Sequence, residues 1–136
     1  MRLVTRILAP LALLLAMFVP AGAASAAPAD SERFETIAFD INFCNGEFVV
    51  GQADVHTVTK QQKDGSYIFH FNLHGQGTGS QGNEYVMNST IKTESSSTNY
   101  SYDSRFMAIS KGSAPNQVIS VHYDNGNYTF QPECRG

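Results

Sequence analysis

The sequence predicts an all-β fold, an antiparallel barrel or sandwich of about seven or eight strands with one disulfide. Three observations predict this class. No segment beyond residue 26 shows a helical period, short stretches alternate between apolar and polar residues, and glycine-rich turns separate these stretches at intervals of about 10–15 residues. Barrel closure is attractive because it removes exposed edge strands.

The first 26 residues have the pattern of a secretory signal peptide. Met1–Arg6 holds two arginines and no acid, an apolar run covers Ile7–Ala24, and Ala24-Ser25-Ala26 has the small-x-small form that a signal peptidase cuts. We therefore expect a signal peptide over residues 1–26 and a single all-β domain over residues 27–136. The mature chain is expected to be secreted.

A retained membrane anchor is the alternative reading of the apolar run. An anchor needs about 20 uninterrupted apolar residues, and Pro10 and Pro20 interrupt this run. Cleavage also removes Arg2 and Arg6, so seven basic residues remain against 12 acidic ones, a formal charge of −5. This charge argues against nucleic acid as a partner and against binding to anionic membranes after the signal is removed.

The first half of the domain reads as three strands. Phe34–Phe43 leads to an Asn45-Gly46 turn, and a second strand over Phe48–Thr59 has Gly51 as a possible bulge. A Lys63–Ser66 turn follows. The third strand is the cleanest, because its large apolar residues alternate on one face: Tyr67, Phe69, Phe71 and Leu73.

The second half begins with a glycine-rich stretch over Gly75–Gly82, which predicts a mobile loop. Strands are then expected over Glu84–Lys92 and Tyr100–Ile109. A bulge is expected near Asp103-Ser104, and a turn follows at Lys111–Asn116.

The last two strands form the strongest local prediction. Val118–Tyr123 and Tyr128–Gln131 flank Asn125-Gly126, the residue pair that two-residue hairpin turns prefer. This turn places Tyr123 opposite Tyr128 and Val121 opposite Phe130. The register predicts that one set of side chains is buried together: Ile119, Val121, Tyr123, Tyr128 and Phe130.

Cys44 and Cys134 allow only one intrachain pairing. Outside the cytosol they are expected to form a disulfide that joins the end of the first strand to the C-terminus. The rival readings, a metal thiolate pair or a reactive nucleophile, lack a second cysteine or histidine at ligand spacing.

Three histidines and a glycine stretch are candidate ligand sites. His70 and His74 share a strand face but lie about 13 Å apart, too far to bind one metal. His56 is expected near His74 with a three-residue turn and opposite Leu73 with a two-residue turn. The Gly75–Gly82 stretch lacks both nucleotide-binding fingerprints, so no metal and no cofactor are predicted.

A calcium loop is the other ligand reading. Asp40-x-Asn42 followed by Asn45-Gly46-Glu47 has suitable residue types, but the spacing misses the EF-hand pattern by one residue. Glu47 is expected instead to hydrogen-bond a neighbouring turn. No catalytic motif is present, and no catalytic residue is assigned. Three formal glycosylation acceptors occur, at Asn88, Asn99 and Asn127.

Cys44-Asn45-Gly46-Glu47, together with the glycine-rich segment that precedes Tyr85, resembles a group of small secreted bacterial proteins, mostly actinobacterial. Their shared elements are a signal peptide, a Cys-x-Gly-Glu element and a glycine-rich segment before a tyrosine. The resemblance implies secretion and an all-β fold, and it assigns no functional residue.

The expected function is that of a non-enzymatic binding module for a small apolar ligand or an extracellular surface partner. A small secreted enzyme of hydrolase or cyclase type and an extracellular inhibitor or adhesion module are the alternatives. An interior pocket lined by aromatic residues would favour a carrier. Converging buried acids or histidines would favour an enzyme, and a solid interior with an exposed apolar patch would favour a partner-binding module.

Overall fold

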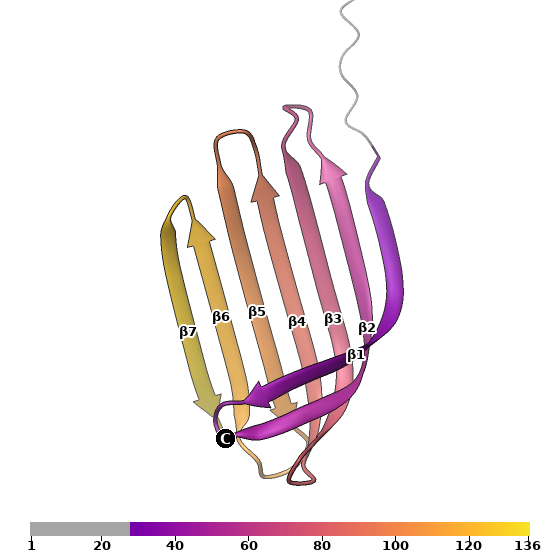
Figure 1. Cartoon of the computed structure of the whole chain (residues 1–136), viewed down its shortest axis with the longest axis vertical. Coiled ribbons are helices and arrows are strands. Elements are labelled where there is room, and N and C mark those ends of the chain that lie inside the picture. Colours follow the sequence, from indigo (N-terminus) through magenta and orange to yellow (C-terminus); the bar gives the residue numbers. More distant parts are fainter. Residues whose placement is uncertain (1–27) are drawn as a thin grey trace, which may run out of the picture.

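The computed structural model describes residues 28–136, so the predicted signal peptide over residues 1–26 lies outside the described residues. Seven antiparallel strands form one sheet in which each strand pairs with its neighbours in sequence (Figure 1). The strands are β1 (Asp30–Asn42), β2 (Glu47–Gln61), β3 (Tyr67–Gly79), β4 (Glu84–Ser95), β5 (Tyr100–Ser110), β6 (Asn116–Asp124) and β7 (Asn127–Arg135). The all-β prediction is confirmed, and over residues 28–136 no helix is long and apolar enough to cross a membrane.

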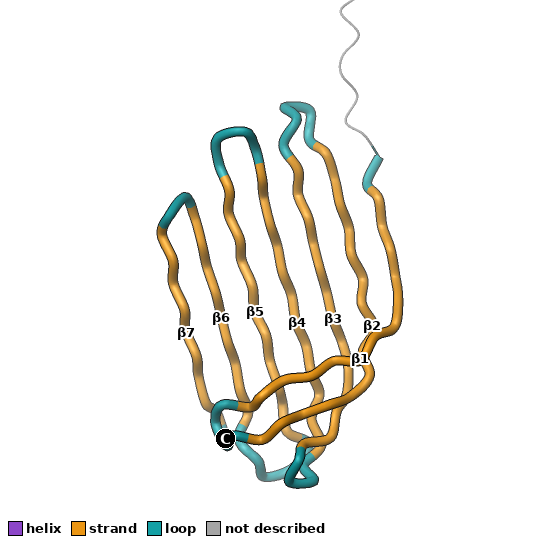
Figure 2. Tube along the Cα trace, in the orientation of Figure 1, coloured by secondary structure: helices purple, strands orange, loops and turns teal. Residues whose placement is uncertain are grey.

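The sheet does not close into a hydrogen-bonded barrel, because β1 and β7 are its two edges. Instead, the end of β1 and the start of β2 fold over the ends of the following strands (Figures 1 and 2). We call residues 37–50 the flap, and we call the sheet face that it covers the inner face. The flap makes one end of the molecule two layers thick and leaves the other end as a single layer.

Glycines permit this fold-over on β2 and β3. Gly51 pairs with Gly77, and a Cβ atom at Gly51 would collide with the backbone of Gln76 and Gly77. A Cβ at Gly79 would likewise collide with the Glu47 carboxylate. Any other residue at Gly51 would force β2 and β3 apart where the sheet bends, and any other residue at Gly79 would displace the Glu47 carboxylate.

The core lies between the flap and the sheet. Ala38 and Val49 of the flap pack with Tyr85 and Met87 of β4 and with Ala108 of β5. Tyr85 and Met87 are fully buried. The flap does not reach the other half of the sheet, and the residues there have no second layer to pack on. The core therefore occupies only the folded-over end of the sheet.

Three local predictions are wrong: the mobile loop over Gly75–Gly82, the bulge at Gly51 and the bulge near Asp103-Ser104. Gly75–Gly79 belongs to β3 rather than to a mobile loop, and only a short turn separates β3 from β4. Strand pairing also continues without an inserted residue past Gly51 and past Asp103-Ser104, so neither position is a bulge. The glycines on β2 and β3 allow the two backbones to approach closely. From the sequence alone, the glycines of the Gly75–Gly82 stretch are interpreted as a sign of a flexible loop.

The β6–β7 hairpin is confirmed with the predicted register. Asn125 and Gly126 both have positive φ, 45° and 96°, and Tyr123 pairs with Tyr128. Positive φ at both central residues is what a type I′ turn requires.

Replacing Gly126 with valine is therefore expected to destabilise the protein by more than about 1 kcal/mol, because a β-branched residue resists positive φ. A Cβ atom at this position meets nothing within 4 Å, so backbone strain is the only cost. Urea unfolding of Gly126→Val beside Gly126→Asn separates these effects: asparagine tolerates this conformation and should cost much less. Equal losses in the two variants would contradict the assigned turn.

Candidate functional site

The part of the inner face that the flap leaves uncovered is uncharged on β3 to β7. Side chains alternate between the two faces of a strand, so the pairing register places one continuous set on this face. Its large members are Tyr67, Phe69, Phe71, Leu73, Ile91, Tyr100, Tyr102, Phe106, Ile119, Val121, Tyr123, Tyr128 and Phe130. The smaller members are serines, one threonine and a proline, and no charged residue of these five strands faces inward.

Tyrosines gather at the open end of this face. Tyr102 pairs with Tyr123, which pairs with Tyr128 on β7, and the rings of Tyr100 and Tyr123 lie 5.8 Å apart. With Val121 they line a shallow hollow of about 400 Å³. Phenol rings combine an apolar body with a polar tip, a combination that is common in binding surfaces.

The expectation that the hairpin side chains are buried together is wrong. Tyr128 is 64% exposed and Phe130 is 51% exposed. The predicted register holds, so these residues do share a face with Val121, but no other part of the described chain covers them. The inner face therefore presents a large apolar surface to its surroundings.

The flap carries a second apolar surface on its outward side. Its members alternate with the core residues of β1 and β2, and two cross-strand pairs, Phe39–Val50 and Ile41–Phe48, lie within it. The most exposed member, Phe39, is 75% exposed. We call this set the flap patch: Ile37, Phe39, Ile41, Phe43, Phe48 and Val50.

A buried carboxylate fixes the base of the flap. Glu47, at the start of β2, is fully buried. Its Oε2 accepts hydrogen bonds from the Tyr85 hydroxyl at 2.6 Å and from Asn83 Nδ2 at 2.9 Å. Its Oε1 accepts one from the Gln81 backbone N–H at 2.8 Å. The expected bond from Glu47 to a neighbouring turn is confirmed, since residues 80–83 connect β3 and β4.

The hydrogen bonds decide the ionisation of this carboxyl. Burial raises the pKa of Glu47, but the donors on Tyr85, Asn83 and Gln81 outweigh burial and lower the pKa to about 2, from an ordinary value of 4.5. Both carboxylate oxygens of Glu47 accept hydrogen bonds, and the side chain is closed to solvent. Glu47 therefore acts as a structural anion that ties the flap to the β3–β4 turn.

We expect the protein to lose stability in acid through Glu47. The folded state binds this proton less readily than the unfolded chain does, so the stabilisation is complete above about pH 4.5 and is lost as the pH falls toward 2. The free energy of unfolding in urea, measured over this range, should rise with pH in the wild type and more weakly in Glu47→Gln. Equal slopes would contradict the assignment.

Tyr85→Phe is the matched variant, because it removes the hydroxyl and keeps the buried ring. It is expected to cost about 1.5–3 kcal/mol at neutral pH, the contribution of a hydrogen bond to a charged group. It should also reduce the pH dependence between pH 4.5 and 2, since the Tyr85 hydroxyl lowers the pKa of Glu47.

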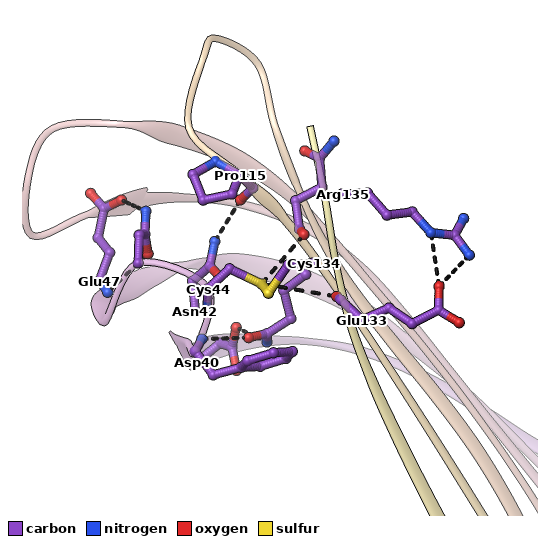
Figure 3. The surroundings of a disulfide bond; sticks show 12 residues. Asp40, Asn42, Cys44, Glu47, Pro115, Glu133, Cys134 and Arg135 are labelled. Atoms are coloured by element: carbon purple, nitrogen blue, oxygen red, sulfur yellow. Dashed lines mark hydrogen bonds and ion pairs between the residues drawn. A yellow bond between two sulfur atoms is a disulfide. The ribbon is translucent and has the colours of Figure 1, made fainter.

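The disulfide holds the tip of the flap to the end of β7 (Figure 3). The Cα atoms of Cys44 and Cys134 lie 5.7 Å apart, and 90 residues separate the two cysteines in sequence. The predicted bond is confirmed, although it joins the two edges of the sheet at one end without a barrel seam of paired strands.

Side-chain hydrogen bonds complete this closure at the start of β6. Asn42 Nδ2 donates to the carbonyl of Pro115 at 2.9 Å. The fully buried Gln117 accepts from the backbone N–H of Phe43 at 2.7 Å and donates to Asp40 Oδ2 at 2.8 Å. Polar side chains thus anchor the flap at the place where a closed barrel would have backbone hydrogen bonds between its first and last strands.

The residues of the calcium reading are used in these contacts. Asp40 and Asn42 bond to Gln117 and Pro115, whereas Asn45 and Glu47 bond to each other at 3.1 Å. Asn45 and Glu47 also both bond to the Tyr85 hydroxyl, so all four side chains are engaged by partners within the chain itself.

The histidines lie apart on the outer face. His56 pairs with Asn72, so it opposes neither His74 nor Leu73. His74 contacts Asn88 and His122 contacts Asp103, each at 2.6 Å. Within residues 28–136 no three His, Cys, Asp or Glu side chains gather as a metal site would require.

Of the three formal glycosylation acceptors, Asn88 lies within β4 and is partly covered by its contact with His74. Asn99 and Asn127 are exposed beside turns at the open end of the sheet.

Sequence reasoning missed the flap and the surfaces that it creates. One signal was present: Phe34–Phe43 carries apolar residues on both strand faces, a pattern typical of strands that are covered on both sides. In the structure one side of this segment packs on the sheet through Ala38, and the other side, which carries the flap patch, is exposed.

The fold and surface define a class: an open antiparallel sheet that is folded over at one end and pinned by a disulfide, with an inner face that is aromatic and uncharged on β3–β7. Comparisons with protein-family models, curated proteins and solved structures give no match.

Proposed function

We propose that the protein is a secreted, non-enzymatic binding module that uses its uncovered inner face to bind an apolar surface of an extracellular protein partner. The observation that carries the proposal is an uncharged face of aromatic and aliphatic side chains that no other part of the described chain covers. Contiguous exposed apolar surface of this kind marks interaction sites in soluble proteins.

The open geometry favours a partner surface over a small ligand. Sites for small molecules bury most of the ligand in a concave pocket, whereas the tyrosine hollow at Tyr102 and Tyr128 is shallow and open. A sheet face, in contrast, is buried by packing against a second layer of protein.

The placement of charged groups supports a non-enzymatic role. The buried carboxylate of Glu47 is saturated by hydrogen bonds from its own chain. No carboxylate, imidazole or amine of β3–β7 faces the uncovered surface, so these strands lack the groups that most often serve as a general acid or base.

Nitration of tyrosine by tetranitromethane tests the proposal. Tyr128 is 64% exposed in the isolated chain and Tyr85 is fully buried. In protein isolated from its culture medium without denaturant, Tyr128 should be nitrated several-fold more slowly than in a Phe130→Glu variant. Thr129→Glu, whose side chain points to the opposite face, is the control and should leave Tyr128 protected.

Mass spectrometry of peptides reads the extent of nitration at each tyrosine, and Tyr85 reports that the fold is intact. Fast nitration of Tyr128 in the wild type, equal to that in Phe130→Glu, would show that nothing covers the inner face and would overturn the proposal.

A further inference from the structure

We propose that the partner is a second copy of this chain, in a reciprocal dimer in which the flap patch of each copy packs on the uncovered inner face of the other. The inference rests on the proposed function and names its partner. It is carried by two apolar surfaces, the flap patch and the inner face, which lie on the same side of the molecule and have complementary shapes.

The shape of the molecule is a step. The flap adds one layer over one end of the inner face, as Ala38 and Val49 pack on Tyr85 and Met87, and the other end remains a single layer (Figure 1). Packed β-layers lie about 10 Å apart, so the flap stands one layer above the uncovered end. A half-turn about an axis across the strands sets the flap of each copy over the uncovered end of the other.

Such a dimer is closed. The same two patches meet twice, the flap patch of the first copy with the inner face of the second and the reverse, as in an isologous interface. Both apolar surfaces of both copies are then covered, and the single-layered end of each copy packs against the two-layered end of the other.

The available area fits a stable interface. Aromatic side chains bury about 150–250 Å² each. Seven of them on these surfaces are between 43% and 75% exposed: Phe39, Phe43, Phe48, Tyr67, Tyr100, Tyr128 and Phe130. They alone offer roughly 750 Å² per copy, which is close to the size of a standard protein–protein interface per partner.

Charge also favours a copy of the same chain. The mature chain is acidic, so two copies repel each other wherever charged surfaces meet. The flap patch and the inner face of β3–β7 carry no charge, so this contact brings two like-charged chains together without opposing carboxylates. Dimerisation is therefore expected to strengthen as salt screens the remaining repulsion.

Other occupants leave part of this surface unexplained. A small apolar molecule in the tyrosine hollow would cover Tyr102 and Tyr128 and leave Phe39 exposed at 75%. A flat contact between two inner faces would likewise leave the flap patch exposed. The reciprocal arrangement covers both surfaces with one partner.

Sedimentation of the secreted protein with its disulfide intact, over a dilution series, tests the inference. The wild type should be a dimer that dissociates on dilution. Phe39→Glu on the flap and Tyr128→Glu on the inner face should each raise the dissociation constant at least about a hundredfold, as expected for loss of a central aromatic contact at two symmetric sites. Thr129→Glu should leave it unchanged.

Mixing the two variants identifies which surfaces meet. The mixed dimer holds one undamaged contact, between the native flap of Tyr128→Glu and the native inner face of Phe39→Glu. The mixture should therefore associate more strongly than either variant alone. Circular dichroism and Tyr85 protection show that each variant folds, since Phe39 and Tyr128 are exposed in the single chain.

A dimer that Phe39→Glu leaves intact, or a mixture that associates no better than its components, would overturn the flap-to-face arrangement. A wild-type monomer would overturn the second copy as partner. If Tyr128 is nevertheless protected in material from the culture medium, the proposed function stands with a different partner; if Tyr128 is reactive, both fail.

Discussion

Replacing Cys44 and Cys134 with serine is expected to lower the free energy of unfolding by about 4–5 kcal/mol, because the bond closes a long loop and removes freedom from the unfolded chain. The two cysteines are separated by 90 residues. For a domain of this size each kcal/mol shifts the melting temperature by about 4–6 °C, so the drop should reach about 15–30 °C. Thermal unfolding by circular dichroism measures it.

The structure adds a local consequence to this loss. The disulfide pins the flap tip, so its removal should also expose backbone near Asn42 and Phe43 to hydrogen exchange well before β4 and β5 unfold. Reduced wild type is the control and should match the double serine variant. A loss below about 1 kcal/mol, with the amides near Asn42 still protected, would show that Gln117 and Pro115 hold the flap unaided.

Gly51→Ala is expected to cost about 3 kcal/mol or more, although alanine is the smallest replacement. A Cβ atom at Gly51 would collide with the backbone of Gln76 and Gly77. Backbone cannot move aside as a flexible side chain can, so the strands must separate at the bend and the flap must lift from Tyr85.

Gly112→Ala is the matched control, because a Cβ atom there meets only Ser110 Oγ, at 4.0 Å. It is expected to be neutral within about 0.5 kcal/mol. Urea unfolding of both variants gives the comparison. Equal effects at Gly51 and Gly112 would contradict the close approach of β2 and β3, and with it the origin of the fold-over.

Much of the local structure followed from the sequence, because period-two alternation and turn chemistry are local signals. Tyr67–Leu73 alternates without interruption and lies in β3, and Asn125-Gly126 turns with both residues at positive φ. The disulfide was predictable for a simpler reason, since two cysteines allow one pairing.

The fold-over was not predictable from local pattern. Glycines at positions 75, 77 and 79 have the composition of a loop, and only the register with β2 shows that they allow close backbone contact. The exposure of Tyr128 and Phe130 was missed for a related reason. Alternation shows which side chains share a face, but whether another layer covers that face depends on how the distant flap folds.

We propose that another protein chain covers the inner face in the working protein. Native mass spectrometry of the protein purified from its own culture medium tests this most directly. We predict an assembly heavier than one disulfide-bonded chain, which dissociates into intact chains and releases no small organic molecule. A single chain, bare or with a retained small apolar compound, would contradict the claim.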